Sequence, residues 1–284
     1  MTIATSPLAD TFQRLRAFDG LCRANIDVHR ADGWLHLSDV PERGLDELFA
    51  AVIRPGPRRR DYAGATVAAT LVDALVSTAL PPLLLERRLP DVSPANVSVL
   101  LHETEWWFTQ VSLHEPLCWV LPSDDAAADS SVCVVAEVAV LHRRLAVTLA
   151  DAVTPWFDAI RARAPFGRRG MWGQLADDLC GSALWTARAS GLDPNAAWRE
   201  ANAILDHVGE AFAELRVRPR RFPVRWSGGE SLWQVKGTCC LWYTTADDHS
   251  DDDAFCTSCP LRPDDVRHER LRDWLETNAA SEAS

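Results

Sequence analysis

Four of the eight cysteines in this chain fall within 21 consecutive residues near its C-terminus. They are Cys239, Cys240, Cys256 and Cys259, which form an adjacent pair and, 15 residues later, a pair separated by two residues. If the four thiols act together, the fold must bring these two short segments to one place. Four thiolates held close by a loop are soft donors that suit a tetrahedral zinc ion or an iron-sulfur cluster.

The spacing of the cysteines leaves the kind of site open. Zinc sites generally place roughly two to four residues between paired cysteines, and the common ferredoxin spacings also differ from this one. Neighbouring residues of a strand point to opposite faces, so Cys239 and Cys240 can share one site only if the backbone turns there. We expect Gly237 to permit that turn. Zinc, an iron-sulfur cluster and a redox dithiol therefore all remain candidates.

Charge and hydropathy exclude several classes of protein. The formal net charge of −11 opposes nucleic-acid binding and attachment to anionic membranes, because both need clustered positive charge. The apolar stretch from Ala63 to Leu85 contains Asp73 and is interrupted by Pro81 and Pro82, so we expect a buried helix and no stable membrane insertion. The N-terminus shows no secretory signal. These features predict a cytoplasmic protein with reduced thiols.

The sequence lacks the glycine-rich fingerprints of dinucleotide sites and P-loops. It also lacks the nucleophile elbow of hydrolases and the two-histidine helix of metalloproteases. If the chain carries out redox chemistry, we therefore expect its electrons to come from another protein.

Hydrophobic periodicity predicts an α+β fold with a mainly helical body, an antiparallel sheet and a small C-terminal module. We expect residues 1–225 to form the body and residues 226–284 to form the module, packed on the body. Pro155 is expected to bend or end its helix, and two short runs, 25–29 and 34–37, are expected to pair as a hairpin. The expected helices cover 7–18, 41–52, 61–80, 138–155, 172–183, 194–208 and a C-terminal segment from Pro263, and the expected strands cover 97–101, 106–113, 118–121 and parts of 226–243.

Two segments of the chain resemble the ferric-siderophore reductases of the FhuF type. The stronger match is Lys236 to Tyr243 (KGTCCLWY) followed by Phe255 to Leu261 (FCTSCPL), and it corresponds to the C-terminal cysteine signature of that family. A second match, Met171 to Leu175 (MWGQL), resembles a Trp-Gly-Asn stretch upstream, with Gln174 in place of the asparagine. The resemblance spans roughly Trp172 to Leu261 and is strong only in its last 30 residues.

This resemblance implies a 2Fe-2S cluster held by Cys239, Cys240, Cys256 and Cys259. It implies one-electron reduction of Fe(III) in a ferric siderophore, for example of hydroxamate type, with release of Fe(II) in the cytoplasm. The electron would come from a donor protein such as a ferredoxin or a flavin reductase. The alternatives are a zinc-stabilised binding protein and a siderophore-biosynthesis-related protein without redox activity.

The segment between the cysteine pairs departs from the family pattern. It has 15 residues instead of about 10 in the family, and the stretch from Asp247 to Asp253 holds five aspartates and His249. A run of like charge usually forms a solvated surface, so we interpret it as a flexible insertion, with a docking face for a basic donor or a modulator of cluster potential as alternatives. His249 is a weak candidate to replace one thiolate.

Three residues outside the cysteine segments are candidates for binding the siderophore. Trp172 is one of twelve tryptophans, although its place on an apolar helical stripe is more typical of the core. Arg220 and Arg221 lie in a basic stretch that precedes the cysteines. Backbone N–H groups of Gly237, Thr238 and Tyr243 are expected to donate to cluster sulfurs. The remaining cysteines are expected to be core residues, namely Cys22, Cys118, Cys133 and Cys180.

Overall fold

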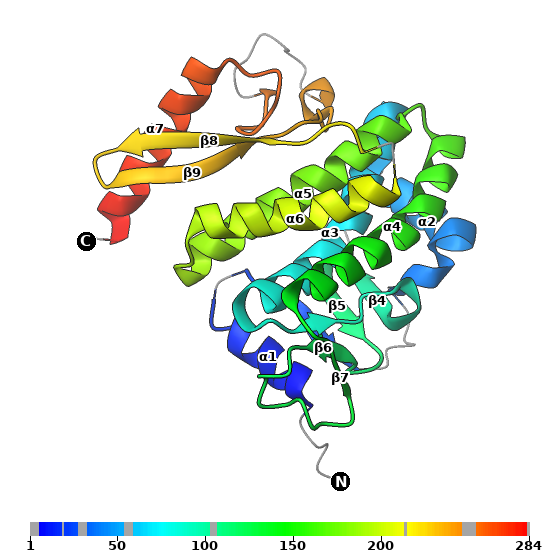
Figure 1. Ribbon diagram of the computed structural model, residues 1–284. Helices are drawn as coiled ribbons and strands as arrows, with labels where there is room; N and C mark the ends of the chain where they lie inside the picture. The colour runs from blue at the N-terminus through cyan, green and yellow to red at the C-terminus, as the bar shows by residue number, and fades with distance from the viewer. Residues whose placement is uncertain are drawn as a thin grey trace.

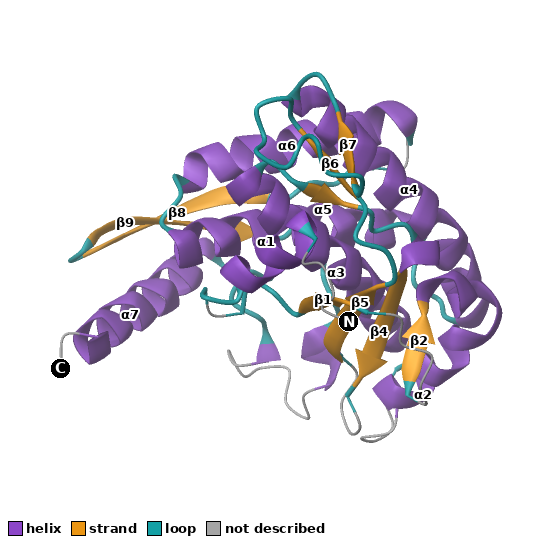
Figure 2. Cartoon of the chain, turned by 90° about the horizontal axis from the view of Figure 1, so that it is seen from below, coloured by secondary structure: helices purple, strands orange, loops and turns teal. Residues whose placement is uncertain are grey.

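The computed structural model describes residues 6–18, 20–27, 33–53, 59–102, 107–212, 215–245 and 254–282 of the chain. In this part, seven α-helices and nine short strands form a mixed α+β fold. The strands belong to three separate small sheets, and helices dominate the molecule (Figures 1 and 2). The expected fold class, a mainly helical body with an antiparallel sheet, is therefore confirmed.

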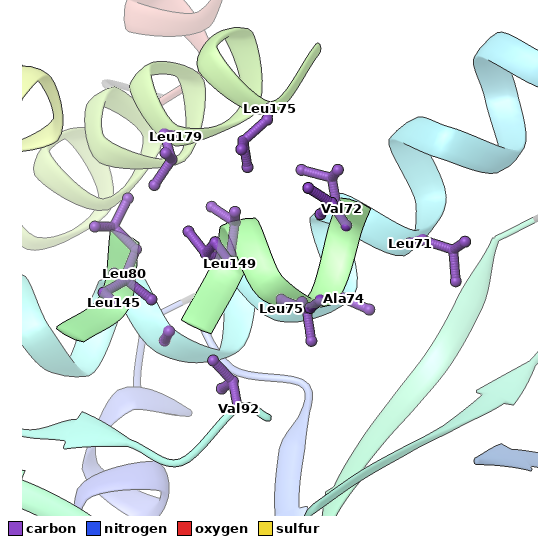
Figure 3. Close-up of a cluster of buried hydrophobic side chains, with 14 of the residues drawn as sticks. Leu71, Val72, Ala74, Leu75, Leu80, Val92, Leu145, Leu149, Leu175 and Leu179 are labelled. Carbon is purple, nitrogen blue, oxygen red and sulfur yellow. The ribbon is translucent and has the colours of Figure 1, made fainter. Parts of the chain in front are cut away.

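Four long helices form the centre of the body. They are α3 (Arg60–Glu86), α4 (Val138–Arg163), α5 (Arg168–Ser190) and α6 (Pro194–Ala211), and they pack on one another in the order α4, α3, α5, α6, with α6 also against α4. Figure 3 shows leucines of α3, α4 and α5 pointing toward one another. Leu75, Leu145, Leu149, Leu175 and Leu179 all have no exposed surface. This shared apolar core fixes the position of α5, which carries part of the site.

Helix α3 runs through two prolines. It is the one described helix that is long and apolar enough to cross a membrane, but 83% of its most apolar window is buried inside the structure, which is typical of a core helix of a soluble protein. The helix continues through Pro81 and Pro82 to Glu86, beyond the end expected at Leu80, and α4 likewise continues through Pro155. A proline inside a helix costs about 3 kcal/mol, and burial of the surrounding apolar turns offsets this cost.

The largest sheet has the strand order β1-β5-β4-β2. Its strands are β1 (Ala24–Ile26), β5 (Phe108–Leu113), β4 (Val97–Leu101) and β2 (Trp34–His36). Strands β4 and β5 are antiparallel as expected, and β1 runs parallel to β5. The expected hairpin of β1 with β2 is wrong, because the two strands lie at opposite edges of the sheet and take partners from later in the chain.

The remaining elements cover this core. Helix α1 (Pro7–Leu15) begins at the Ser6 cap, whose hydroxyl accepts a hydrogen bond from the Ala9 amide at 3.2 Å. Helix α2 (Leu45–Ile53) follows a short 3-10 turn (Leu37–Asp39) and a single π-turn (Val40–Gly44), and another 3-10 turn (Pro94–Asn96) precedes β4. The small sheet β3-β6-β7 consists of Leu89–Pro90, Cys118–Val120 and Val132–Val134. The stretch expected as a strand at 118–121 therefore belongs to a sheet of its own.

A β-hairpin and the last helix form a smaller unit beside α5 and α6 (yellow to red in Figure 1). Strands β8 (Arg220–Trp226) and β9 (Gly229–Val235) pair along their whole length, and α7 (Asp264–Glu282) packs on β8. Their apolar side chains form a second, separate cluster of buried residues. The expected C-terminal module began at residue 226, but β8 belongs to the smaller unit and begins at Arg220. In the structure the smaller unit therefore begins at about Arg220.

Candidate functional site

The fold brings the two cysteine pairs together. Cys239 and Cys240 follow β9, whereas Cys256 and Cys259 precede α7, and these two elements belong to the same small unit. The four thiols lie near one another in the order Cys240, Cys256, Cys259 and Cys239, and each one alters the acidity of the next. The adjacent cysteines of the first pair therefore both face the second pair.

A turn just after the first pair makes this possible. Leu241 has a left-handed backbone with φ of 61°, which is uncommon for a branched residue, and the amide of Lys236 donates to the Ser258 carbonyl at 2.9 Å. Gly237 was expected to permit the turn, but it has no positive φ. Instead, a side chain there would lie 2.7 Å from the Arg218 carbonyl oxygen, so Gly237 is required for close approach.

Helix α5 holds the segment that leads into Cys239. The Oδ1 of Asp177 accepts a hydrogen bond from the Gly237 amide at 2.6 Å, and its Oδ2 accepts one from the Thr238 amide at 3.0 Å. Gly173 and Gly181 lie one turn before and one turn after Asp177 on the same face. A Cβ at Gly173 would lie 1.8 Å from the Thr238 hydroxyl oxygen. The segment that leads into Cys239 can therefore pack closely against this face of α5 because the residues one turn away on either side of Asp177, Gly173 and Gly181, have no side chains.

Two arginines hold the second pair. Arg267 of α7 has no exposed surface, and its guanidinium donates to the carbonyls of Thr257, at 3.0 Å, Cys259 and Arg262. Arg262 donates to the carbonyls of Phe255 and Cys256. Because an arginine presents five N–H donors in a rigid fork, each of the two arginines donates hydrogen bonds to more than one carbonyl group. The Cys256–Cys259 loop is therefore held by Arg262 and by Arg267 of α7, in addition to the backbone hydrogen bond from Lys236 to Ser258.

Backbone amides donate to three of the sulfurs. Leu241 donates to Cys239 Sγ at 3.4 Å, Trp242 donates to Cys240 and Leu261 donates to Cys259. The expectation for Gly237 and Thr238 is wrong, because the Asp177 carboxylate takes both of their amides. The ring of Tyr243 stacks on Phe255 with centroids 5.3 Å apart. The sulfurs are thus supplied with donors from the turn after each pair.

The thiols differ in acidity. The hydrogen bond from Cys259 lowers the pKa of Cys239, whereas donation to Cys256 and burial raise the pKa of Cys240. Burial alone would lower the pKa of Lys236, but the negative charges of Cys256, Cys240 and Asp177 outweigh it and raise this pKa. Lys236, the only lysine of the chain, therefore places a positive charge beside sulfurs that become negative on metal binding.

A cavity of about 300 Å³ opens beside Cys240, between α5, α3 and the start of the cysteine segment. Polar side chains form much of its wall, including Asp73, Gln174, Asp178, Gln234, Lys236 and Cys240. Both amide atoms of Gln174, Oδ2 of Asp178 and Oε1 of Gln234 are buried and have no hydrogen-bond partner among the described residues. Buried polar atoms nearly always have partners, so we expect water or a ligand to pair with these atoms in the cavity.

Acidic side chains in this cavity have altered acidity. Burial raises the pKa of Asp177 to about 7, against the amides of Gly237 and Thr238, which lower it. Burial, with Asp73 as the next cause, also raises the pKa of Asp178. Carboxyl groups that hold a proton near neutral pH can donate as well as accept hydrogen bonds.

The three residues predicted to bind the siderophore do not line the cavity beside Cys240. Trp172 has no exposed surface, stacks on Phe212 with centroids 5.1 Å apart and does not line this cavity, so it occupies the core position that its helical stripe indicates. Arg220 pairs with Asp264 at 2.6 Å, and Arg221 donates to the amide oxygen of a neighbouring side chain, Asn195. The structure thus pairs both arginines with side chains and places neither in the wall of the cavity beside Cys240.

Other predictions have mixed outcomes. The acidic stretch from Asp247 to Asp253, with His249, lies outside the described residues. All eight cysteines are described and free. Cys118 and Cys180 are buried as expected and Cys22 is half-buried, but Cys133 is exposed, because β7 is an edge strand whose residues 133 and 134 face solvent. Cys133 is therefore not a core residue.

Several residues of the site were not anticipated. Asp177 and Asp178 interrupt the apolar stripe of α5, and a pair of acidic residues inside a buried helix is a signal that could have identified them. Gln174 appeared only as a departure from the family pattern. Arg262 and Arg267 carry no signal, because their role depends on carbonyls that only the folded loop presents.

The donor set fits a metal centre in kind and number. Four cysteines, two from each segment, are the ligands of structural zinc and of 2Fe-2S clusters. Among the described residues, no three side chains of His, Cys, Asp or Glu already stand close enough to enclose a metal ion. Metal binding would therefore replace the thiol protons and draw the four sulfurs together.

Comparisons with known proteins do not assign the chain to a family. No protein-family model matches the chain, and no curated protein matches it.

Proposed function

We propose that this protein is a ferric-siderophore reductase that holds a 2Fe-2S cluster through Cys239, Cys240, Cys256 and Cys259 and works in the cytoplasm. The observation that carries the proposal is that the fold brings the two cysteine pairs together, so that each thiol alters the acidity of the next. It is supported by the resemblance of both contacting segments, α5 around Gly173 and the cysteine segments, to the same reductase family.

A 2Fe-2S cluster supplies one electron at a time. This electron would reduce siderophore-bound Fe(III) to Fe(II), whose lower charge would weaken its bonds to hard oxygen ligands. The chain contributes the surroundings of the sulfurs. The amides of Leu241, Trp242 and Leu261 donate to them, and Lys236 adds positive charge. Hydrogen bonds to sulfur and nearby charge both favour the reduced, more negative state.

The cavity beside Cys240 gives the siderophore a place to bind. Cys240 is part of its wall, so a ligand there would lie next to the electron source. The unpartnered atoms of Gln174, Asp178 and Gln234 would bond to polar groups of the chelate, for example hydroxamate and amide groups. A cavity of about 300 Å³ admits only part of a siderophore, so the rest would extend over the surface. The electron donor, a ferredoxin or a flavin reductase, would bind elsewhere.

Metal and sulfide analysis of anaerobically purified protein tests the proposal. We expect about two irons and two acid-labile sulfides per chain, with broad absorption at roughly 400–600 nm. The variant Cys240→Ser should lose most of the iron and colour. Cys133→Ser is the matched control, because Cys133 is exposed and outside the site, and it should keep both.

Substrate reduction is then measured with the same proteins. Chemically reduced wild-type protein should reduce a ferric hydroxamate siderophore, detected by a ferrous chelator, and Cys240→Ser should not. A colourless protein that contains one zinc and no sulfide would overturn the proposal in favour of a zinc-stabilised binding protein. A protein with neither metal would favour a biosynthesis-related protein without redox activity.

A further inference from the structure

A second concave surface adjoins the cavity described above and shares Gly181, Trp185 and Gln234 with its wall. Two adjoining hollows of about 440 and 220 Å³ are formed by α5, β9 and α7, elements that lie side by side in Figure 1. We call this surface the aromatic groove. Its principal lining residues are Trp185, Arg188, Trp233, Arg270, Leu271 and Trp274. Thr257 and Ser258, between the two cysteines of the second pair, complete its wall.

Tryptophan rings form the walls of the aromatic groove. Trp233 and Trp274 meet edge to face with centroids 5.6 Å apart. Trp185 and Trp274 are each 48% exposed, although large aromatic side chains normally bury most of their surface. Exposed rings in a groove are a surface on which a flat ligand can stack.

The charge of the groove is positive. Its described lining contains Arg188 and Arg270 but no Asp or Glu, in a chain whose net charge is −11. The Arg188 guanidinium lies 3.9 Å from the centroid of Trp233, and no carboxylate within the described residues pairs with it. By contrast, Arg88 pairs with Asp124 at 2.8 Å and Arg220 with Asp264 at 2.6 Å. A guanidinium fixed on a ring and left without a carboxylate is ready to bind an anion.

We propose that the aromatic groove binds an anionic ligand with a planar aromatic ring, which stacks on the tryptophans while the negative charge of the ligand pairs with Arg188. Under the proposed function, two sources share this chemistry. One is the electron acceptor, a ferric chelate whose anionic catecholate rings would extend from the adjoining cavity into the groove. The other is the electron donor, a flavin that carries a phosphate. Either would lie against Thr257, next to two of the cluster ligands. The choice between them rests on the proposed function, whereas the binding itself does not.

Calorimetric titration of the purified protein tests the inference without turnover, so its result is independent of reductase activity. The probes are flavin mononucleotide, neutral riboflavin with the same ring, the ferric tris-complex of 2,3-dihydroxybenzoate and a neutral ferric hydroxamate. We expect at least one anionic aromatic probe to bind, and Arg188→Gln to weaken its binding by at least about tenfold, as loss of a charge-assisted hydrogen bond predicts.

Arg144→Gln is the matched control. Arg144 is also exposed and also lies over a tryptophan, 4.2 Å from the centroid of Trp119, but it is outside the aromatic groove, so this variant should bind like the wild type. Binding of the flavin probe identifies the donor as the source, and binding of the ferric dihydroxybenzoate complex identifies the acceptor.

Two outcomes would overturn the inference. One is the absence of binding by both anionic probes to the wild-type protein. The other is equal binding of flavin mononucleotide and riboflavin together with equal binding of the two ferric complexes, since charge would then play no part. The second comparison uses wild-type protein only, so it holds even if Arg188→Gln fails to fold.

Discussion

Replacement of Gly173 by alanine tests how the small unit is seated on α5. A Cβ at this position would lie 1.8 Å from the Thr238 hydroxyl oxygen and 3.0 Å from the Thr238 Cβ. A rotation of the Thr238 side chain would move the hydroxyl but not the Cβ, which is held in place because Asp177 accepts the Thr238 amide hydrogen. The change to alanine gains about 1 kcal/mol of helix propensity, but such overpacking costs roughly 1–3 kcal/mol or more. We therefore expect Gly173→Ala to lower the free energy of unfolding by about 1–2 kcal/mol.

The control for helix propensity is Gly209→Ala in α6. A Cβ there would meet only the end of the Arg218 side chain, at 3.4 Å, so this variant should be as stable as the wild type or up to about 1 kcal/mol more stable. Thr238→Ala supplies the reciprocal test, because it removes the hydroxyl while leaving the Cβ in place. In the Gly173→Ala background it should recover about 1–2 kcal/mol, a coupling typical of residues in contact.

Chemical denaturation and metal content are measured on all four variants. We expect Gly173→Ala to lose metal as well as stability, because the displaced residue directly precedes Cys239. If Gly173→Ala proves as stable as Gly209→Ala, or if the effects of Gly173→Ala and Thr238→Ala simply add, the close approach of the cysteine segment to α5 is refuted.

Two further predictions concern the residues that hold the site. Because the pKa of Asp177, about 7, lies above its ordinary value of 3.8, the folded protein keeps a proton that the unfolded chain releases. The free energy of unfolding should therefore fall as the pH rises from about 4 to 7. Denaturation curves of Asp177→Asn should lack up to about 4 kcal/mol of this pH dependence. Arg267→Met, which strands buried carbonyls, should cost about 3 kcal/mol and release metal, whereas Arg272→Met, at an exposed position of α7, should change thermal stability little.

Local sequence signals predicted most of the helices. The spacing of Leu45, Leu48 and Val52 and the Asp193-Pro194 start indicated α2 and α6, and both helices are present. These signals work because a helix satisfies its backbone hydrogen bonds within one segment. The prolines inside α3 and α4 were misread, since burial by distant segments outweighs a local cost. The predicted pairing of β1 with β2 is wrong for the same reason, because the pattern of a strand does not indicate which strand it pairs with.

The candidate site was predictable only in part. The clustering of four cysteines in the sequence identified residues that the fold brings together, because such a cluster can be recognised from the sequence alone. Their surroundings were not visible. The contact of Asp177 with Gly237 joins residues 60 positions apart, and the buried state of Arg267 depends on a loop that only the folded chain forms. The pairing of Arg220 with Asp264 likewise could not be read from a basic stretch.

The two halves of the cysteine site are anchored separately, and this affects how such sites vary between proteins. Asp177 anchors the segment before Cys239, whereas Arg262 and Arg267 anchor the loop from Cys256 to Cys259. Insertions or deletions between the pairs can therefore accumulate while the sulfurs stay in place. Related proteins would be recognised less by the spacing of their cysteines than by a helix with the pattern Gly-x3-Asp-x3-Gly, here Gly173 to Gly181, far upstream of them.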